Sequence, residues 1–222
     1  MIHLAALLAA AFQPAEPPEP PFPLDDSIQA ERQFAADAQT LGQWTAFAKW
    51  AHPDGVLVGR SVVNARDFAS AQENPETALR WWPVRVIHSC DFRTAINIGG
   101  WEDPATGEAG TFHTVWVKGE NGWSYLVDLG TEGRTALPDT GGVDVKKASC
   151  LNREGTDKLR RMYPANAVYE RSGRGVSPDG TIMYTWGIEP DGGKSFRVHA
   201  WDGYHPRTVY DFRMPPPAEP AS

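Results

Sequence analysis

The chain has 222 residues, a formal net charge of −7, 41% hydrophobic residues and 22% charged residues. These values are typical of a folded globular protein, so they exclude a chain that is disordered throughout. No run rich in Lys or Arg stands out in the sequence, although nucleic-acid binding needs a basic patch or stripe. We therefore expect no nucleic-acid partner.

The first residues resemble a targeting segment. Residues 2–12 form an uncharged apolar run that contains Ala9-Ala10-Ala11. The run is too short to span a bilayer, but its length and small residues suit a signal peptide with a cleavage site. We predict a signal peptide over residues 1–12, a periplasmic or secreted location and no membrane anchor. The alternative is a plain apolar N-terminal tail.

Proline-rich stretches flank the central part of the chain. Residues 13–26 predict an extended linker, and residues 215–222 predict a disordered tail. Between them, Asp26 and Ser27 are good N-cap residues. Apolar side chains then recur at spacings of three and four from Ala30 to Ala48, which predicts one long helix over residues 28–50 with Gly42 inside it.

Short elements follow the long helix. Residues 56–58 and 62–63 predict strands, Asn64 predicts a helix cap, and Asn74-Pro75 predicts a second short helix as far as Leu79. Four further strands are expected over residues 84–90, 95–101, 111–117 and 123–129, the last two joined by a turn at 120–122. Helices followed by an antiparallel meander indicate an α+β fold.

The C-terminal part has its own pattern. Residues 155–163 predict a helix, and residues 181–186, 195–201 and 207–212 predict a three-stranded antiparallel meander. Ser172–Gly175 is interpreted as a loop. Because such a meander must bury its apolar face, we expect residues 133–214 to form an extension that packs on the domain of residues 27–132.

The two cysteines, Cys90 and Cys150, allow either a disulfide or two separate buried thiols. Export would favour the disulfide, which would tie the C-terminal part to the central sheet. The sequence has no Cys-x-x-Cys and no His-x-x-x-His, so we predict no metal site and no cofactor.

Several short motifs lie in a common order along the central part of the chain. They are Ala30–Asp37 with its continuation through Gly42, Trp44 and Ala46-Phe47, then Trp82-Pro83, Gly100-Trp101, Thr111–Trp116, Gly122-Trp123 and Val127–Gly130. In these motifs the chain resembles the nuclear transport factor 2-like (SnoaL-like) superfamily, and within it the uncharacterised exported bacterial proteins. The resemblance implies a cone fold, in which a long helix and short helices pack on a curved antiparallel sheet around a pocket. Relatives include isomerases, cyclases, dehydratases, ligand binders and dimers, so the fold does not decide the function.

Four residues are candidates for acid–base chemistry in such a pocket: Asp37, His88, His113 and Asp128. Asp37 lies one turn from Phe34 on the helix face expected to be buried. The two histidines follow valines on one strand face, and simple alternation puts Asp128 on the face opposite Tyr125. Each has a structural alternative, either an ion pair, a turn contact or a hydrogen-bonded core histidine.

Five tryptophans are candidates for the pocket wall, where they would suit a flat apolar ligand. They are Trp44, Trp81, Trp82, Trp101 and Trp116. Ordinary packing between helix and sheet is the alternative. Three functions stay open at this point: a protein that binds a small apolar or aromatic molecule without catalysis, an isomerase-, cyclase- or dehydratase-type enzyme, and an interaction module or homodimer with a filled cone.

Overall fold

A computed structural model describes residues 27–133 and 135–214 of the chain. The predicted signal peptide, the linker and the C-terminal tail lie outside these described residues. Within them, no helix is long and apolar enough to cross a membrane.

The described chain forms four helices and two sheets. The helices are α1 (Ser27–Leu41), α2 (Gln43–Trp50), α3 (Ala65–Ser70) and α4 (Glu154–Met162). The first sheet contains β1 (Ala51–Val58), β2 (Val62–Asn64), β3 (Arg80–His88), β4 (Thr94–Glu102), β5 (Ala109–Gly119), β6 (Gly122–Thr131) and β7 (Asp144–Lys147). The second sheet contains β8 (Asn166–Val168), β9 (Ser172–Val176), β10 (Ile182–Ile188), β11 (Lys194–Trp201) and β12 (Pro206–Met214).

The seven strands of the first sheet follow the order β2-β1-β6-β5-β4-β3-β7. Strands β3 to β6 form the predicted antiparallel meander, whereas β1 pairs in parallel with β6 and β7 pairs in parallel with β3. The second sheet is antiparallel, in the order β12-β11-β10-β9-β8. The prediction of an α+β fold is confirmed, with a mixed first sheet and an antiparallel second one.

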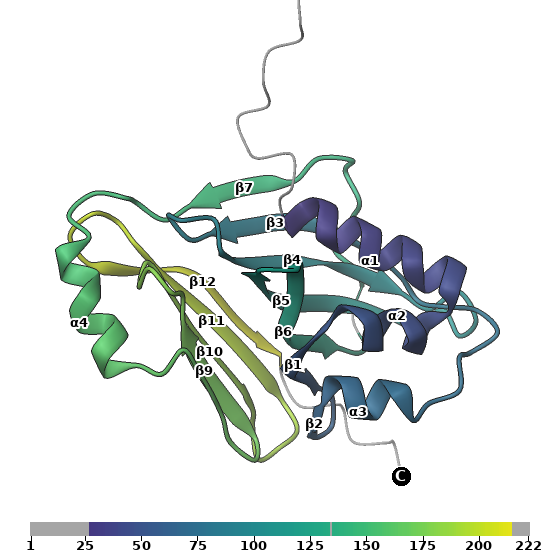
Figure 1. Cartoon of the computed structure of the whole chain (residues 1–222). Coiled ribbons are helices and arrows are strands. Elements are labelled where there is room, and N and C mark those ends of the chain that lie inside the picture. The colour runs from purple at the N-terminus through teal and green to yellow at the C-terminus, as the bar shows by residue number, and fades with distance from the viewer. Residues whose placement is uncertain (1–26, 134, 215–222) are drawn as a thin grey trace, which may run out of the picture.

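The two faces of the first sheet have different coverings (Figure 1). Helices α1 to α3 lie on one face, where Phe34, Trp116 and Tyr125 belong to a shared core. The second sheet packs on the opposite face, where Ile98 and Val115 meet side chains such as Phe196. Outside the bulges, alternation along the strands supplies residues to the two cores in turn. The C-terminal extension therefore packs on the sheet face opposite the helices.

The prediction of one helix over residues 28–50 is wrong, because the helix breaks at Gly42. Gly42 has φ of 97°, a conformation that glycine adopts without strain, and a Cβ there would lie 2.3 Å from the Asn74 side chain. Asn74 does not cap a helix of its own, which corrects the second prediction. Its Oδ1 instead accepts hydrogen bonds from the backbone N–H groups of Trp44 (2.7 Å) and Thr45 (3.2 Å). It thus caps α2 from about 30 residues away.

Three strands were not foreseen. The expected three-stranded meander is a five-stranded sheet, because β8 and β9 extend it beyond β10. Ser172–Gly175 is part of β9, not a loop. The two glycines of this stretch, Gly173 and Gly175, suggested a loop in the sequence. In the structure they allow the strand to pack closely, since a Cβ at either position would collide with the rings of Trp186 or Tyr184. Strand β7 likewise joins the first sheet, through a parallel pairing with β3 that no local sequence pattern predicts.

Cys90 and Cys150 form a disulfide, which is the alternative that export would favour. The bond ties the end of β3 to the segment that leads into α4 and the second sheet. Hydrogen bonds reinforce this junction: Thr181 Oγ1 accepts from the Cys90 N–H, and Asp179 Oδ2 accepts from the Asp91 N–H, both at 2.9 Å. The chain is therefore closed by a covalent link where its two sheets meet.

Candidate functional site

A pocket of about 300 Å³ opens on the helix-covered side of the first sheet. Its walls come from α1, α2, the segment before β3, strands β1, β3, β4, β5 and β6, and one residue of β11. The lining side chains are mostly apolar or acidic: Glu31, Gln43, Trp44, Phe47, Leu57, Val58, Leu79, Trp81, Trp101, Asp103, Glu108, Phe112, Asp128, Glu132 and Lys194, together with Gly59 and Gly130. Such a mixture of ring surface and a few polar groups is typical of small-molecule sites.

Glu31 lies at the base of this pocket, on the first turns of α1. Its side chain is 1% exposed and accepts three hydrogen bonds. The indole of Trp116 donates to Oε2 at 2.7 Å, the amide of Asn97 donates to the same oxygen at 3.2 Å, and the indole of Trp81 donates to Oε1 at 2.9 Å. Three strands thus converge on one carboxyl group of the helix.

Asp128 reaches the pocket because β6 carries a bulge at Leu126. Val115 and Trp116 of β5 pair with Val127 and Tyr125, so Leu126 is an extra residue. The bulge reverses the alternation beyond it. Asp128 therefore faces the helices together with Tyr125, which corrects the prediction from simple alternation that they face opposite sides.

The environment changes the acidity of both carboxyl groups. Burial raises the pKa of Glu31 to about 7. The hydrogen bond from Trp116 lowers this pKa, and the charge of Asp128 raises it further. Burial raises the pKa of Asp128 to about 7 as well, although the hydrogen bond from the Thr114 hydroxyl and the charge of Lys194 both lower it. Asp128 is half-buried because the pocket reaches it. The two groups can therefore hold or release a proton near neutral pH.

Lys194 brings the second sheet into the site. It begins β11, and its Nζ donates to the backbone oxygen of Gly130 at 2.6 Å. Burial lowers the pKa of Lys194, while the charges of Glu132 and Asp128 raise it, with a net decrease. The C-terminal extension thus contributes to the pocket wall as well as covering the opposite sheet face.

Three of the five candidate tryptophans line the pocket, namely Trp44, Trp81 and Trp101. Trp116 is fully buried behind Glu31, and it acts on the site through its hydrogen bond. Trp82 is next to Trp81 on β3 and points to the other face, where its indole donates to the backbone oxygen of Leu137 at 2.8 Å. Trp82 is therefore no part of this pocket wall.

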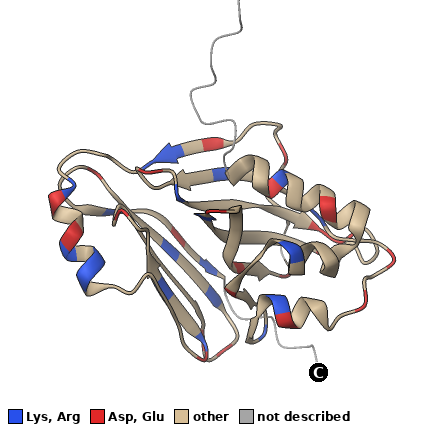
Figure 2. Cartoon of the chain, viewed as in Figure 1, with Lys and Arg blue, Asp and Glu red and all other residues tan. Residues whose placement is uncertain are grey.

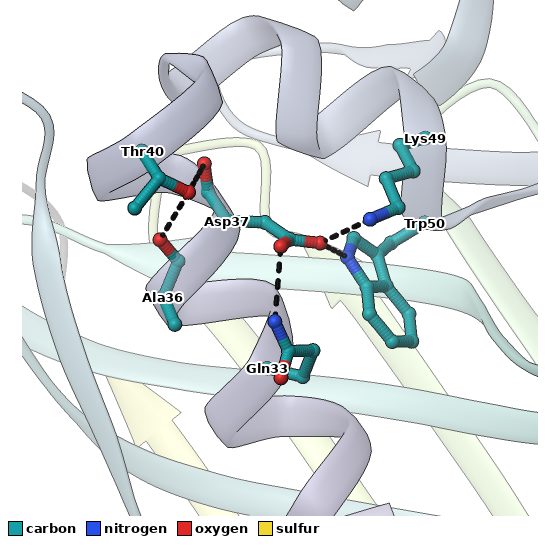
Figure 3. A network of polar contacts seen from close by, with 6 residues as sticks. All are labelled: Gln33, Ala36, Asp37, Thr40, Lys49 and Trp50. Atoms are coloured by element: carbon teal, nitrogen blue, oxygen red, sulfur yellow. Dashed lines mark hydrogen bonds and ion pairs between the residues drawn. The ribbon is translucent and has the colours of Figure 1, made fainter.

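Asp37 lies outside the pocket, in a polar network between α1 and α2 (Figure 3). Lys49 Nζ is 2.6 Å from its Oδ2, the Trp50 indole donates to the same oxygen at 2.8 Å, and the Gln33 amide donates to Oδ1 at 3.1 Å. Burial alone would raise the pKa of Asp37, but these hydrogen bonds outweigh it and lower the pKa. The structure thus gives Asp37 the surroundings of an ion pair that joins two helices.

The two candidate histidines are buried away from the pocket. His113 lies between the sheets, where Tyr210 Oη is 2.8 Å from its Nε2 and the Phe196 and Phe212 rings pack against it. Burial lowers its pKa to about 3, so the imidazole is neutral. His88 ends β3 with the ring of Phe92 5.2 Å away. Of the four acid–base candidates, the structure brings Asp128 alone to the described pocket.

Sequence reasoning missed Glu31, although a signal was present. Glu31 precedes Phe34 by three residues and Ala38 by seven, the spacings that place residues on one helix face. The same spacing argument selected Asp37, which lies three residues beyond Phe34. The two carboxylates occupy the two edges of the buried stripe, and their sheet partners decide which one meets the pocket.

No family model matches the chain, and no curated protein matches it. Among solved structures, the chain is similar to a putative calcium/calmodulin dependent protein kinase II association domain from Xanthomonas campestris. The two share 17% sequence identity with a TM-score of 0.35, over 50% of this chain and 85% of that chain. A likeness of this size carries no argument about function. What the pocket does must therefore be inferred from its own residues.

Proposed function

We propose that this chain is an exported protein of the nuclear transport factor 2-like (SnoaL-like) superfamily whose cone-shaped pocket binds a small organic molecule. The motifs between Ala30 and Gly130, and the helices on one face of the first sheet, support the family. The Cys90–Cys150 bond supports export, because disulfides persist in oxidising compartments. A homodimer, which the resemblance also allows, stays a prediction.

The observation that carries the proposal is the pocket itself. Its volume of about 300 Å³ is at the lower end of the range for ligand sites, which suits a single ring system with a short substituent. Aromatic side chains supply much of the wall, and two carboxyl groups supply polar contacts at Glu31 and Asp128. A flat, mainly apolar molecule with one polar end fits this arrangement.

A fragment library screened by ligand-observed NMR tests the binding function. We expect hits whose signals are lost in Leu57→Trp, because Leu57 lines the pocket and the larger side chain would fill it. Trp82→Phe is the control, since Trp82 lies on the other face of the sheet. Thermal unfolding of each variant shows that it is folded. Fragments that bind the wild type and Leu57→Trp equally well would place binding elsewhere and overturn the proposal.

A second candidate function is proton transfer to and from the bound molecule. It is favoured by one observation, the two pocket carboxyl groups whose pKa values are both raised to about 7. A general acid or base works best when its pKa is near the working pH. In this function Asp128 would take a proton from the ligand and Glu31 would stabilise the resulting negative oxygen in its protonated form, as a carboxylic acid.

Hydrogen–deuterium exchange separates catalysis from binding alone. Ketone fragments that bind in the pocket are incubated with the protein in D₂O, and NMR follows the loss of hydrogen next to the carbonyl group. If the protein catalyses proton transfer, we expect Asp128→Asn to slow the exchange about 100-fold or more. Asp144→Asn, which changes an exposed partner of Arg85, should leave the rate unchanged. Exchange no faster than in buffer would exclude the catalytic function for these ligands.

A further inference from the structure

Three hydrogen-bond donors around the pocket are engaged by the protein. The Trp81 indole donates to Glu31, and the Trp101 indole donates to the Thr131 backbone oxygen at 3.0 Å. The Lys194 ammonium group donates to Gly130. With these N–H groups engaged, the two indoles offer a ligand mainly their ring surfaces, which carry negative charge density on their faces.

One acceptor of the pocket, the Asp128 carboxylate, has unused capacity. The Asp128 carboxylate accepts one long hydrogen bond, from the Thr114 hydroxyl at 3.4 Å, among the contacts within the described residues. An ionised carboxylate has room for about four hydrogen bonds. The pocket reaches this half-buried carboxylate, so its unused acceptor capacity is open to a ligand. The pocket therefore presents a carboxylate that a ligand N–H group would complete.

The charge of the pocket wall is strongly one-sided. Five carboxyl groups line it, those of Glu31, Asp103, Glu108, Asp128 and Glu132, against the ammonium group of Lys194. Elsewhere both signs occur together, as on α4, where acidic residues in the first turn are followed by basic residues in the last turn (Figure 2). A cleft lined by charges of one sign and apolar walls concentrates ligands of the opposite sign.

These observations lead to one ligand class, which deepens the binding function proposed above and rests on it. We propose that the pocket takes a protonated amine attached to an aromatic ring, with its ammonium N–H groups on Asp128 and its ring between the indoles of Trp81 and Trp101. The carboxylates would supply the hydrogen bonds and the opposite charge. The indole faces would add cation–π attraction, which strengthens when the cation loses water.

Three probes that share an indole ring test the charge of the ligand. Tryptamine carries an ammonium group, tryptophol replaces it with a hydroxyl group on the same two-carbon arm, and indole-3-acetate carries a carboxylate. We expect tryptamine to bind at least tenfold more tightly than tryptophol, and indole-3-acetate to bind more weakly than either. Isothermal titration calorimetry at pH 7.5 and low salt measures all three affinities on the full chain.

Variants locate the preference at one carboxylate. Asp128→Asn should reduce the affinity for tryptamine at least tenfold while changing that for tryptophol by less than threefold. Asp144→Asn removes a carboxylate of the same kind from the exposed Arg85 ion pair and should preserve the preference. The comparison of the three probes on the wild type stays decisive even if the Asp128 variant does not fold.

The outcomes distinguish this inference from the binding function. Tryptophol binding as tightly as tryptamine would overturn the charge preference and leave a pocket that binds neutral rings. The same conclusion holds if none of the probes binds while the fragment library gives pocket ligands that carry no amine. If neither the probes nor the library gives a ligand sensitive to Leu57→Trp, both proposals fall.

Discussion

The two faces of the first sheet bury ionisable groups in contrasting surroundings. On the helix side, Glu31 and Asp128 border a pocket, and their pKa values are raised to about 7. On the side of the second sheet, His113 is enclosed by aromatic rings, and its pKa is lowered to about 3. Burial favours the neutral form in both places.

The contrast lies in what surrounds the neutral group. His113 has a fixed partner in Tyr210, aromatic rings pack against it, and its side chain is fully buried between the sheets. Asp128 borders open space and has one weak donor. A buried titratable group beside a cavity therefore supports a functional hypothesis, whereas one inside close packing is explained by the fold.

Leucine truncation gives the largest expected difference between the faces. Leu129 is fully buried against the second sheet, and Leu57, on the adjacent strand, lines the pocket. Leu129→Ala should lower the free energy of unfolding by about 3–5 kcal/mol, because it creates a cavity in a filled core. Leu57→Ala should cost only about 1 kcal/mol, because it enlarges an existing space. Urea unfolding measures both, and equal costs would mean that the two faces are packed alike.

His113 should make the protein less stable in acid. Its pKa is lowered from 6.5 to about 3, so the unfolded state binds its proton first as the pH falls. Stability contributed by the neutral imidazole is present above pH 6.5 and is lost as the pH falls towards 3. By pH 4 the loss is roughly 3.5 kcal/mol, because each unit of pH below 6.5 costs about 1.4 kcal/mol until the pKa of the folded state is reached.

Urea unfolding of His113→Phe between pH 7 and 4 measures this contribution. In the variant, the free energy of unfolding should fall less steeply as the pH decreases. His205→Phe in an exposed turn is the control and should keep the wild-type profile. If the free energy of unfolding of His113→Phe fell as steeply in acid as that of the wild type, the assignment of a neutral buried imidazole would be contradicted.

Glu31 should have the opposite effect on stability. Its pKa is raised from 4.5 to about 7, so the folded state holds the proton more tightly. The contribution is present below pH 4.5 and is lost as the pH rises to about 7, by roughly 3 kcal/mol. In Glu31→Gln, whose side chain has no such proton, the decline over this range should disappear from the urea unfolding profile. Exposed Glu154→Gln should keep it. A decline of the same size in Glu31→Gln would assign it to other groups.

The smallest effect is expected at the long-range cap of α2. Asn74→Ala removes the acceptor for the Trp44 and Thr45 backbone N–H groups and should cost about 1 kcal/mol. Because Trp44 lines the pocket, the same change should also weaken ligand binding. Thermal unfolding and calorimetry measure the two effects. Asn64→Ala, which uncaps α3, is the matched control and should lose stability without the loss of binding.

The sequence correctly predicted the strands and caps that are determined by residues close together in the chain. The β3–β6 meander and the Asn64 cap follow from alternation, turn residues and one capping side chain, all within short stretches of sequence. The break at Gly42, the Asn74 cap and strand β9 depend on partners far along the chain, so short patterns gave the wrong element at each. Tertiary contacts override local preferences at these positions.

The same division applies to the candidate site. Trp44, Trp81 and Trp101 could be foreseen as wall residues because aromatic side chains recur where helix and sheet must meet. Glu31 had the spacing of a buried residue, but its three N–H donors come from β3, β4 and β5. Only the assembled sheet shows that a carboxylate is accommodated there.

The bulge at Leu126 determines which positions of β6 face the pocket. Because Leu126 is an extra residue, Tyr125 and Asp128 lie on the same face although they are three positions apart, and the same sequence in a regular strand would turn the carboxylate toward the second sheet. Deleting Leu126 would leave Tyr125 and Asp128 two positions apart in a regular strand, where alternation keeps both on the helix side. Among homologues, an aspartate three positions after the tyrosine therefore faces the pocket only where the strand keeps the bulge, and one two positions after it only where the strand is regular.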